Sequence, residues 1–247
     1  MNEIELPEQN TSIKRGRGRP RKDESQLPLT RDSIAVEALK IIGSEGFAAL
    51  SMSRLAAAFG ATPRALYNYV NDRQEVMNLA VAKFLESTPM LRFDVGNWQE
   101  TVRVFYQASR ALYREYPWIA VVPVTERVVV DGGPRYVEMM ERLLQFYTDL
   151  GLSLPQALSL VRAFIREIKA FALQDDYYKD RVPDGQIPVI SQLVPEYWLD
   201  EAAAQNSPLV RQTLDFPIQG NDALFEELLE MRIFTIQAML DELPEAD

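Results

Sequence analysis

From Leu29 to the end of the chain, apolar residues recur at intervals of three and four, the spacing of residues on one face of a helix. Thr30 is a favoured helix N-cap residue and Gly46 a favoured C-cap residue, so the first helix is expected between them. The alternation of apolar and polar residues that marks a half-buried strand is almost absent. The pattern therefore predicts an all-α protein.

Further helices are expected along the rest of the chain. Two short ones follow the N-cap residues Ser51 and Thr62, separated by a turn at Gly60, and a longer one begins near Arg73. Longer helices are predicted over residues 98–116, 136–150, 153–177 and 222–242, and short ones near 124–130 and within 194–205. Residues 1–28 are polar and have no apolar period, so we expect them to be disordered.

The 247-residue chain contains neither Cys nor His. This composition excludes a disulfide framework, a thiolate nucleophile, a histidine general base and any metal site built on these two residue types. The adjacent carboxylates Asp175 and Asp176 would point about 100° apart on a helix, a poor arrangement for an acid–base pair. We therefore expect no enzymatic activity, no metal site and no cofactor.

The chain also carries no signal for a membrane. No apolar run approaches the roughly 20 residues that a helix needs to cross a bilayer, and the polar N-terminus lacks the apolar segment of a signal peptide. A cytoplasmic protein without membrane contacts is expected.

The net charge of −10 is distributed unevenly. Residues 85–247 carry a net charge of −12, whereas residues 1–28 and 29–84 carry +1 each, and the basic residues of the first segment all lie between Lys14 and Lys22. Salt screens charges beyond a Debye length of about 8 Å. A basic arm and a near-neutral small domain can therefore approach a polyanion while the acidic body faces away.

Two short helices around Gly60 form the unit that places a second helix in the major groove of DNA. Apolar residues such as Leu55 and Leu66 are expected to hold the two helices together. The residues left facing outward are Thr62, Pro63, Arg64, Tyr67, Asn68 and Tyr69. Such side chains suit hydrogen bonds to phosphates and base edges, and Arg73 is placed to meet a phosphate beside the backbone N–H groups of the next helix. The alternative is an ordinary helical hairpin whose tyrosines pack on their neighbours.

Residues 29–85 resemble the DNA-binding domain of the TetR family of bacterial transcriptional regulators. The resemblance is carried by the stretches ALSMSRLA (49–56), GATPRALYNYV (60–70) and NDRQEV (71–76). It implies a three-helix helix-turn-helix DNA-binding domain over residues 29–76. Residues 77–247, which resemble the family in layout alone, would form a larger helical domain for ligand binding and dimerisation.

The same resemblance implies which residues touch DNA. These positions are Ser53, Thr62, Pro63, Arg64, Tyr67, Asn68, Tyr69 and Arg73. Tyr67 stands where the family has its most typical phosphate-binding tyrosine. Asn68, Tyr69, Val70 and Arg73 depart from the residues common at their positions, so the operator sequence is not predicted.

The N-terminal arm adds a second basic element. The run Arg17-Gly18-Arg19-Pro20 resembles an AT-hook, in which glycine permits close approach and proline stiffens the chain. Arg17 and Arg19 are therefore expected to lie along a narrow A·T minor groove. The alternative is a solvated basic tail.

In the family, two long C-terminal helices of each subunit form a four-helix bundle, which here corresponds to residues 154–177 and 222–242. The alternative is that their apolar faces are buried within one subunit. The remaining helices would enclose a ligand cavity, and the residues expected there are Phe105, Tyr106, Arg110, Tyr113, Trp118, Phe146, Phe164 and Phe171. The alternative for each aromatic residue is packing in the core. The alternative for Arg110 is pairing with a carboxylate.

These features imply a ligand-responsive transcriptional regulator, expected to be a repressor, that binds a palindromic operator in double-stranded DNA as a homodimer. Its small-molecule effector is not predicted. The alternative is an architectural protein that binds A·T-rich DNA without ligand control.

Overall fold

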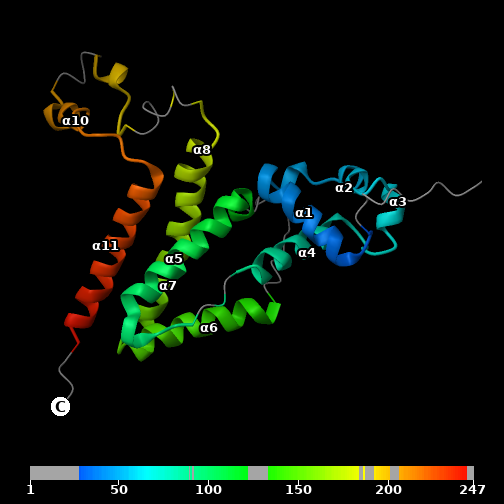
Figure 1. Cartoon of the computed structure of the whole chain (residues 1–247), viewed down its shortest axis with the longest axis horizontal. Coiled ribbons are helices and arrows are strands. Elements are labelled where there is room, and N and C mark those ends of the chain that lie inside the picture. Colours follow the sequence, from blue (N-terminus) through cyan, green and yellow to red (C-terminus); the bar gives the residue numbers. More distant parts are fainter. Residues whose placement is uncertain are drawn as a thin grey trace, which may run out of the picture.

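The computed structural model describes residues 28–88, 90, 92–121, 133–183, 186, 192–200 and 206–243. Every regular element within these ranges is helical, which confirms the predicted all-α class. Figure 1 shows a small group of short helices, here called the head (residues 28–86), beside a larger group of longer helices, here called the body (described residues from 92 onward).

The head begins its helices at the predicted caps. It consists of α1 (Arg31–Glu45), the 3-10 turn η1 (Phe47–Ala49), α2 (Met52–Ala58), α3 (Pro63–Leu66) and α4 (Arg73–Glu86). Thr30 Oγ1 accepts a hydrogen bond from Ser33 N at 3.0 Å, and Ser51 Oγ accepts one from Arg54 N at 3.2 Å. Gly46 ends α1 with a φ of 88°, a conformation that glycine adopts without strain.

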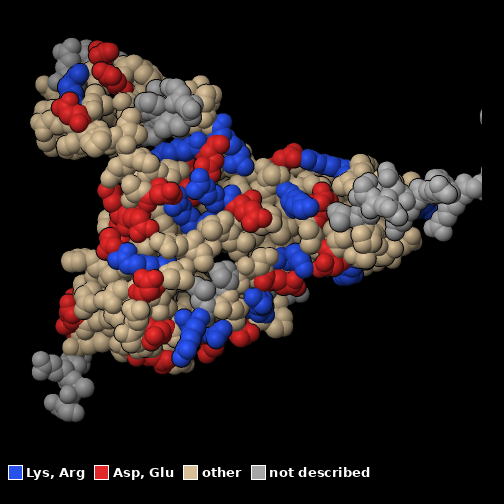
Figure 2. All heavy atoms as spheres, viewed as in Figure 1, with Lys and Arg blue, Asp and Glu red and all other residues tan. Residues whose placement is uncertain are grey.

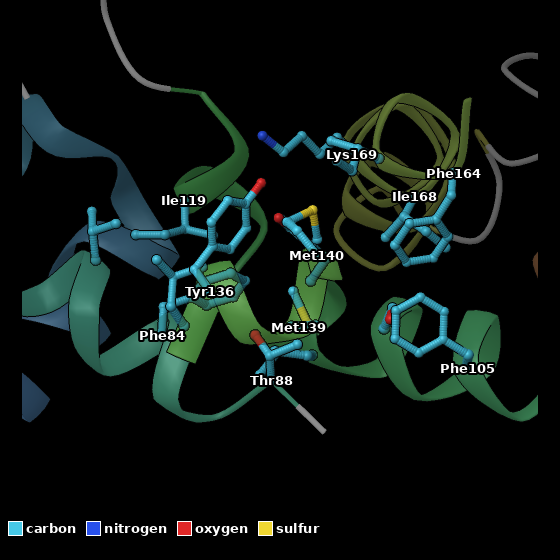
Figure 3. Close-up of a pocket in the computed structure, with 16 residues that line it drawn as sticks. Phe84, Thr88, Phe105, Ile119, Tyr136, Met139, Met140, Phe164, Ile168 and Lys169 are labelled. Carbon is cyan, nitrogen blue, oxygen red and sulfur yellow. The ribbon is translucent and has the colours of Figure 1, made fainter. Parts of the chain in front are cut away.

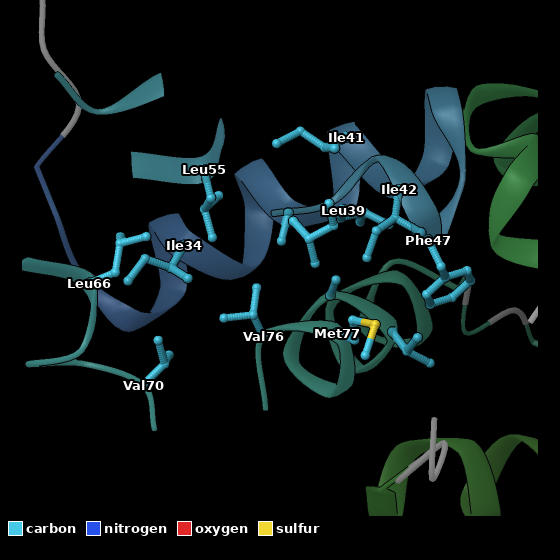
Figure 4. Packing of buried hydrophobic residues seen from close by; sticks show 14 of the residues in the cluster. Ile34, Leu39, Ile41, Ile42, Phe47, Leu55, Leu66, Val70, Val76 and Met77 are labelled. Atoms are coloured by element: carbon cyan, nitrogen blue, oxygen red, sulfur yellow. The ribbon is translucent and has the colours of Figure 1, made fainter. Parts of the chain in front are cut away.

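A single apolar core holds the head together (Figure 4). The buried residues labelled in that view are Ile34, Leu39, Ile41, Ile42, Phe47, Leu55, Leu66, Val70, Val76 and Met77. Burying a side chain of this size contributes about 1.5–3 kcal/mol. Because α1 packs along α4 and α2 packs on α3, these contacts fix the short α3 on a scaffold much larger than itself.

The body is built from longer helices. Its elements are η2 (Val95–Asn97), α5 (Trp98–Glu115), η3 (Pro117–Ala120), α6 (Gly133–Asp149), α7 (Leu154–Phe171), the π-helical turn η4 (Ala172–Asp176), α8 (Tyr177–Lys179), η6 (Glu196–Asp200), α10 (Pro208–Thr213) and α11 (Asn221–Asp241). A second apolar core joins α5, α6, α7 and α11. In the described part of the chain, no helix is both long and apolar enough to cross a membrane.

Several expected elements differ from those observed. The helix predicted after Thr62 is a single short turn that ends at Leu66. The single helix predicted over residues 153–177 is interrupted by the π-helical turn η4. The boundary predicted at residue 76 falls inside α4, whose buried residues as far as Phe84 belong to the core of the head. The helix predicted near 124–130 lies outside the described residues, as do residues 201–205.

The π-helical turn is held by a buried ion pair. Arg110 of α5 donates to Asp176 through Nε at 2.9 Å and Nη2 at 2.7 Å, and Asp176 is fully buried. Asn221 at the start of α11 donates to the same carboxylate at 3.1 Å. The guanidinium also lies over the rings of Phe171 and Phe225, 5.0 and 4.6 Å from their centroids. These contacts join α5, η4 and α11 at one point.

The head meets the body through α1, α4 and η3. Ile119 of η3 is buried in the core of the head, and Tyr116 lies against Gly43 of α1. A Cβ atom at Gly43 would lie 2.5 Å from Tyr116 Cδ1 and 3.0 Å from its Cβ. Glycine at this helical position therefore permits the close approach of α1 to the end of α5.

Replacing Gly43 tests this contact. The Gly43→Ala change would ordinarily stabilise a helix by about 0.5–1 kcal/mol, but here the methyl group has no room. We expect it to lower the free energy of unfolding by about 1–3 kcal/mol in thermal or denaturant unfolding. In a Tyr116→Ala background, where only the contact with Cβ remains, the same change should cause a smaller loss. An unchanged stability of Gly43→Ala in the natural background would contradict the packing.

Candidate nucleic-acid interface and ligand cavity

The end of the head farthest from the body presents the turn and α3 to solvent (Figure 1). Leu55, Leu66 and Val70 are buried beneath this surface, whereas Tyr67 and Tyr69 have 52% and 41% of their surface exposed. The other exposed residues among the predicted DNA contacts are Ser53, Thr62, Pro63, Arg64 and Asn68. Seven of the eight predicted head residues are therefore exposed on α2, on α3 and in the turn after α3, and the surface of these elements is here called the recognition face.

The backbone of the recognition face is fixed by short-range hydrogen bonds. Ala61 N donates to Ala56 O at 2.9 Å across the turn, and Tyr69 N donates to Leu66 O at 2.9 Å after α3. Arg31 Nη1 reaches from α1 to the carbonyl oxygen of Tyr69 at 3.3 Å. The exposed tyrosines therefore project from a backbone that is tied to the head.

Arg31 and Glu75 close the recognition face at its C-terminal end. Glu75 accepts a hydrogen bond from Asn71 N at 2.6 Å and pairs with Arg31. The hydrogen bond from the Asn71 backbone, followed by the nearby Arg31 guanidinium, lowers the pKa of Glu75 from its usual value. The carboxylate stays ionised at neutral pH, and it links α1 to the start of α4.

Arg73 requires a correction. Its Nε donates to Leu50 O at 2.8 Å and its Nη2 to Phe47 O at 2.6 Å, and the residue is half-buried. The side chain therefore points into the head and away from the recognition face. It donates to carbonyl oxygens at the first residue of η1 and at the residue that follows η1. The phosphate contact expected from it is not supported; its place in the structure is to anchor the start of α4.

The charge of the recognition face differs from that of the body. Residues 52–71 contain two arginines and neither Asp nor Glu. Figure 2 shows red acidic side chains gathered over the body, while the outer end of the head is mostly tan where it is not grey. The segment that carries Tyr67 and Arg64 thus has no acidic residue of its own, and Glu75 at its edge is paired with Arg31. Arg17 and Arg19 lie outside the described residues.

A cavity of about 130 Å³ lies where the head meets the body (Figure 3). The described residues that line it are Val81, Phe84, Leu85 and Thr88 from α4 and its end; Phe105, Ser109, Leu112 and Tyr113 from α5; Ile119 from η3; Tyr136, Met139 and Met140 from α6; and Phe164, Ile165, Ile168 and Lys169 from α7. Figure 3 shows Phe105 and Phe164 on one side, Phe84 and Ile119 on the other, and Lys169 extending from α7 over the space between them.

Three of the eight predicted ligand residues line this cavity, namely Phe105, Tyr113 and Phe164. The five others have different neighbours. Tyr106 is fully buried and donates to Glu167 at 3.0 Å, and Trp118 stacks edge-on against Tyr177 with ring centroids 5.2 Å apart.

The remaining three are also structural in this chain. Phe146 packs against Phe93 and Tyr147, with ring centroids 5.4 and 5.2 Å apart. Arg110 and Phe171 belong to the ion-pair cluster around Asp176 described above. The structure therefore places these five residues outside the lining of this cavity. An aromatic stripe on a helix indicates burial without distinguishing core from cavity.

Sequence reasoning missed the contribution of α4, α6 and Lys169. Lys169 follows Ile165 by four residues and therefore shares its face, but Arg162 and Arg166 lie beside it, so the sequence alone does not separate it from the charged surface of the helix. The contribution of α4 had no signal either.

The apolar faces predicted to pair subunits are partly exposed in the single chain. On α11, Met231 and Phe234 have 64% and 75% of their surface exposed, and on α7 Leu154 and Leu158 are also exposed. Other residues of both helices are buried in the core of the body. Each helix therefore has one apolar face inside the subunit and another that is left to solvent.

The comparisons with known proteins agree with this architecture. Residues 93–240 match the family model described as tetracyclin repressor-like, C-terminal domain. The chain therefore belongs to the TetR family of transcriptional regulators, as the resemblance of its head indicated.

The individual relatives are identical to this chain at 29% or fewer of the aligned positions. The chain is 29% identical over 134 residues to the HTH-type transcriptional repressor DrrR1 of Streptomyces coeruleorubidus, an alignment that covers 54% of this chain and 48% of that protein. The chain thus spans about half the length of this curated relative.

Solved structures match over most of the chain. ActR from Streptomyces coelicolor in complex with actinorhodin is 26% identical, with a TM-score of 0.67 and coverage of 87% of this chain and 100% of that one. ActR in complex with (S)-DNPA is 26% identical, with a TM-score of 0.63 and coverage of 86% and 98%.

Replacing two arginines of the head, one anchored inside it and one on the recognition face, tests the structural role assigned to Arg73. Arg73→Met removes charged donors from the carbonyls of Phe47 and Leu50, so we expect the free energy of unfolding to fall by about 1–3 kcal/mol. Arg64→Met, which removes the same charge from the exposed recognition face, should leave stability within about 0.5 kcal/mol. Chemical denaturation of the two variants measures the difference. Equal stabilities would contradict the anchoring assigned to Arg73.

Proposed function

We propose that this protein is a ligand-responsive transcriptional repressor that binds double-stranded DNA as a homodimer and releases it when a small molecule fills the cavity. It acts in the cytoplasm by binding, without catalysing a reaction. Support comes from its membership of the TetR family, from the exposed recognition face, and from a cavity at the junction of head and body.

The observation that carries the proposal is that α4 serves both sites. Its first half, including Val76 and Met77, packs against α1 in the core of the head. Its second half lines the cavity with Val81, Phe84 and Leu85. A ligand that displaces the second half of α4 must therefore move the first half, or bend the helix between them.

The head would follow α4 as one unit. Lys83 Nζ of α4 pairs with Asp32 Oδ1 of α1 at 2.7 Å, and Arg73 ties the start of α4 to the end of η1. Well-packed cores resist continuous deformation, so a displacement at the cavity appears as a rotation of the whole head. By linkage, a ligand that weakens DNA binding is itself bound more weakly by the DNA complex, by the same factor.

Dimerisation supplies the spacing that DNA requires. Adjacent half-sites lie about 34–36 Å apart, so two recognition faces must be held at a fixed separation to enter successive major grooves. The exposed faces of α7 and α11, with Leu158 and Phe234, are the surfaces we assign to the interface between subunits. A rotation of each head about such a fixed interface changes the separation of the recognition faces.

Each site is assigned by what surrounds it. Ser53, Thr62, Pro63, Arg64, Tyr67, Asn68 and Tyr69 are proposed to contact DNA, with Arg17 and Arg19 adding contacts in the minor groove. The two ActR structures each hold a small molecule, which supports assigning the cavity of this chain to an effector. An architectural protein would have no use for a cavity that shares α4 with the DNA-binding head.

Selection of bound sequences from random duplexes tests the function with the full chain. We expect a palindrome with half-sites about one helical turn apart. A set of A·T-rich sequences without a palindrome would contradict the proposal and favour the architectural alternative.

The recognition face is tested by Tyr67→Phe. Removing one hydrogen bond to a charged phosphate should weaken binding to the selected operator by about tenfold. Tyr178→Phe is the matched control, because this tyrosine of the body is 58% exposed and should leave affinity unchanged. Fluorescence anisotropy with labelled operator measures both. An equal affinity of the two variants would remove Tyr67 from the interface.

A further inference from the structure

The cavity has walls that suit a flat ring. Phe105 and Phe164 lie with ring centroids 4.6 Å apart on one side, and Phe84 meets Tyr113 edge-on at 4.9 Å. Aromatic rings favour offset-stacked and edge-to-face contacts with other aromatic rings. Aliphatic residues and methionines fill the rest of the lining, so a mostly apolar guest loses little on entering.

Lys169 does not fit a purely apolar site. It is the only charged residue among the described residues that line the cavity, and within the described part of the chain its ammonium group makes no ion pair or hydrogen bond. Burial lowers the pKa of Lys169, because the charged form loses hydration that nothing in the described structure replaces. An unpaired cation facing a cavity is stabilised when an anionic group enters.

Hydroxyl groups in the lining add hydrogen-bonding capacity. Ser109 is buried, and its Oγ has no hydrogen-bond partner in the described structure. Burial raises the pKa of Tyr113, so its phenol remains a neutral donor throughout the physiological range. A buried polar atom without a partner calls for an explanation, and a polar ligand substituent supplies one.

The size of the cavity limits the guest. An apolar cavity of roughly 150 Å³ can hold a benzene ring, so 130 Å³ is about the size of a single ring, and a substituent must lie at its edge. A larger ligand must displace the lining, and α4 is part of that lining. The residues of α4 that line the cavity thus limit the size of the ligand, and a ligand that exceeds this limit displaces them.

We propose that the cavity binds a planar aromatic compound carrying one acidic group, with the ring among Phe84, Phe105 and Phe164 and the anionic group held by the ammonium of Lys169. This inference rests on the proposed function in that it takes the cavity to be the effector site. It adds the chemical class of the effector and names Lys169 as the residue that selects charge.

Calorimetric titration of the full chain, without DNA, with benzoate and with benzamide tests the proposal. The two probes match in shape and differ in charge. Because a hydrogen bond between charged groups is about twice as strong as a neutral one, benzoate should bind at least about tenfold more tightly. In Lys169→Met the preference should vanish, while the affinity for benzamide stays unchanged.

Lys40→Met is the matched control, because it removes the same charge from an exposed lysine of α1 that pairs with Glu37. It should retain the preference for benzoate, and unfolding curves of both variants verify that they fold. Equal binding of the two probes by the natural chain, no binding of either, or a preference that survives in Lys169→Met would overturn the proposal.

The outcomes also separate this inference from the proposed function. A chain that prefers benzoate through Lys169 and ignores operator DNA would contradict the proposed function alone. A chain that binds a palindromic operator and shows no preference between the probes would overturn the ligand class alone.

Discussion

Helix α4 packs against two partners at once, and the proposed coupling of the two sites depends on this packing. Its first half is buried in the core of the head with α1, and its second half forms a wall of the cavity with Phe84. A displacement of the second half therefore moves the first half unless the helix bends between them. The shared helix connects the recognition face to the cavity, although the two sites are formed by different segments of the chain.

A second constraint holds the far side of the cavity in place. The buried pair of Arg110 and Asp176 joins α5 to the π-helical turn that follows α7, and Asn221 ties the start of α11 to the same carboxylate. A buried ion pair by itself adds little to the free energy of unfolding. Removing one partner would leave an unpaired buried charge and would destabilise the fold. The body therefore presents a wall that carries Lys169, opposite a wall formed by α4.

Much of the fold could be predicted because its signals are local. The N-caps Thr30 and Ser51 and the glycine turn of the helix-turn-helix are short-range features of the sequence, and the structure shows the helices starting at those caps. The same reasoning failed for Arg73, whose partners are carbonyl oxygens more than twenty residues away. Nor could it show that Tyr106 lies outside the lining of the cavity, since a stripe of aromatic residues marks burial equally for core and cavity. Only the three-dimensional arrangement separates these cases.

The most direct measurement of the proposed coupling is the distance between the two heads of the proposed homodimer. The chain contains no cysteine, so Ala57→Cys on the exposed side of α2 provides a single site for a spin label. Double electron–electron resonance spectroscopy would measure the distance between the labels in this protein and in the same protein carrying Ser109→Phe, which fills the cavity from α5. The account predicts a displaced distance distribution and weaker operator binding in the filled variant; superimposable distributions with unchanged operator affinity would contradict it.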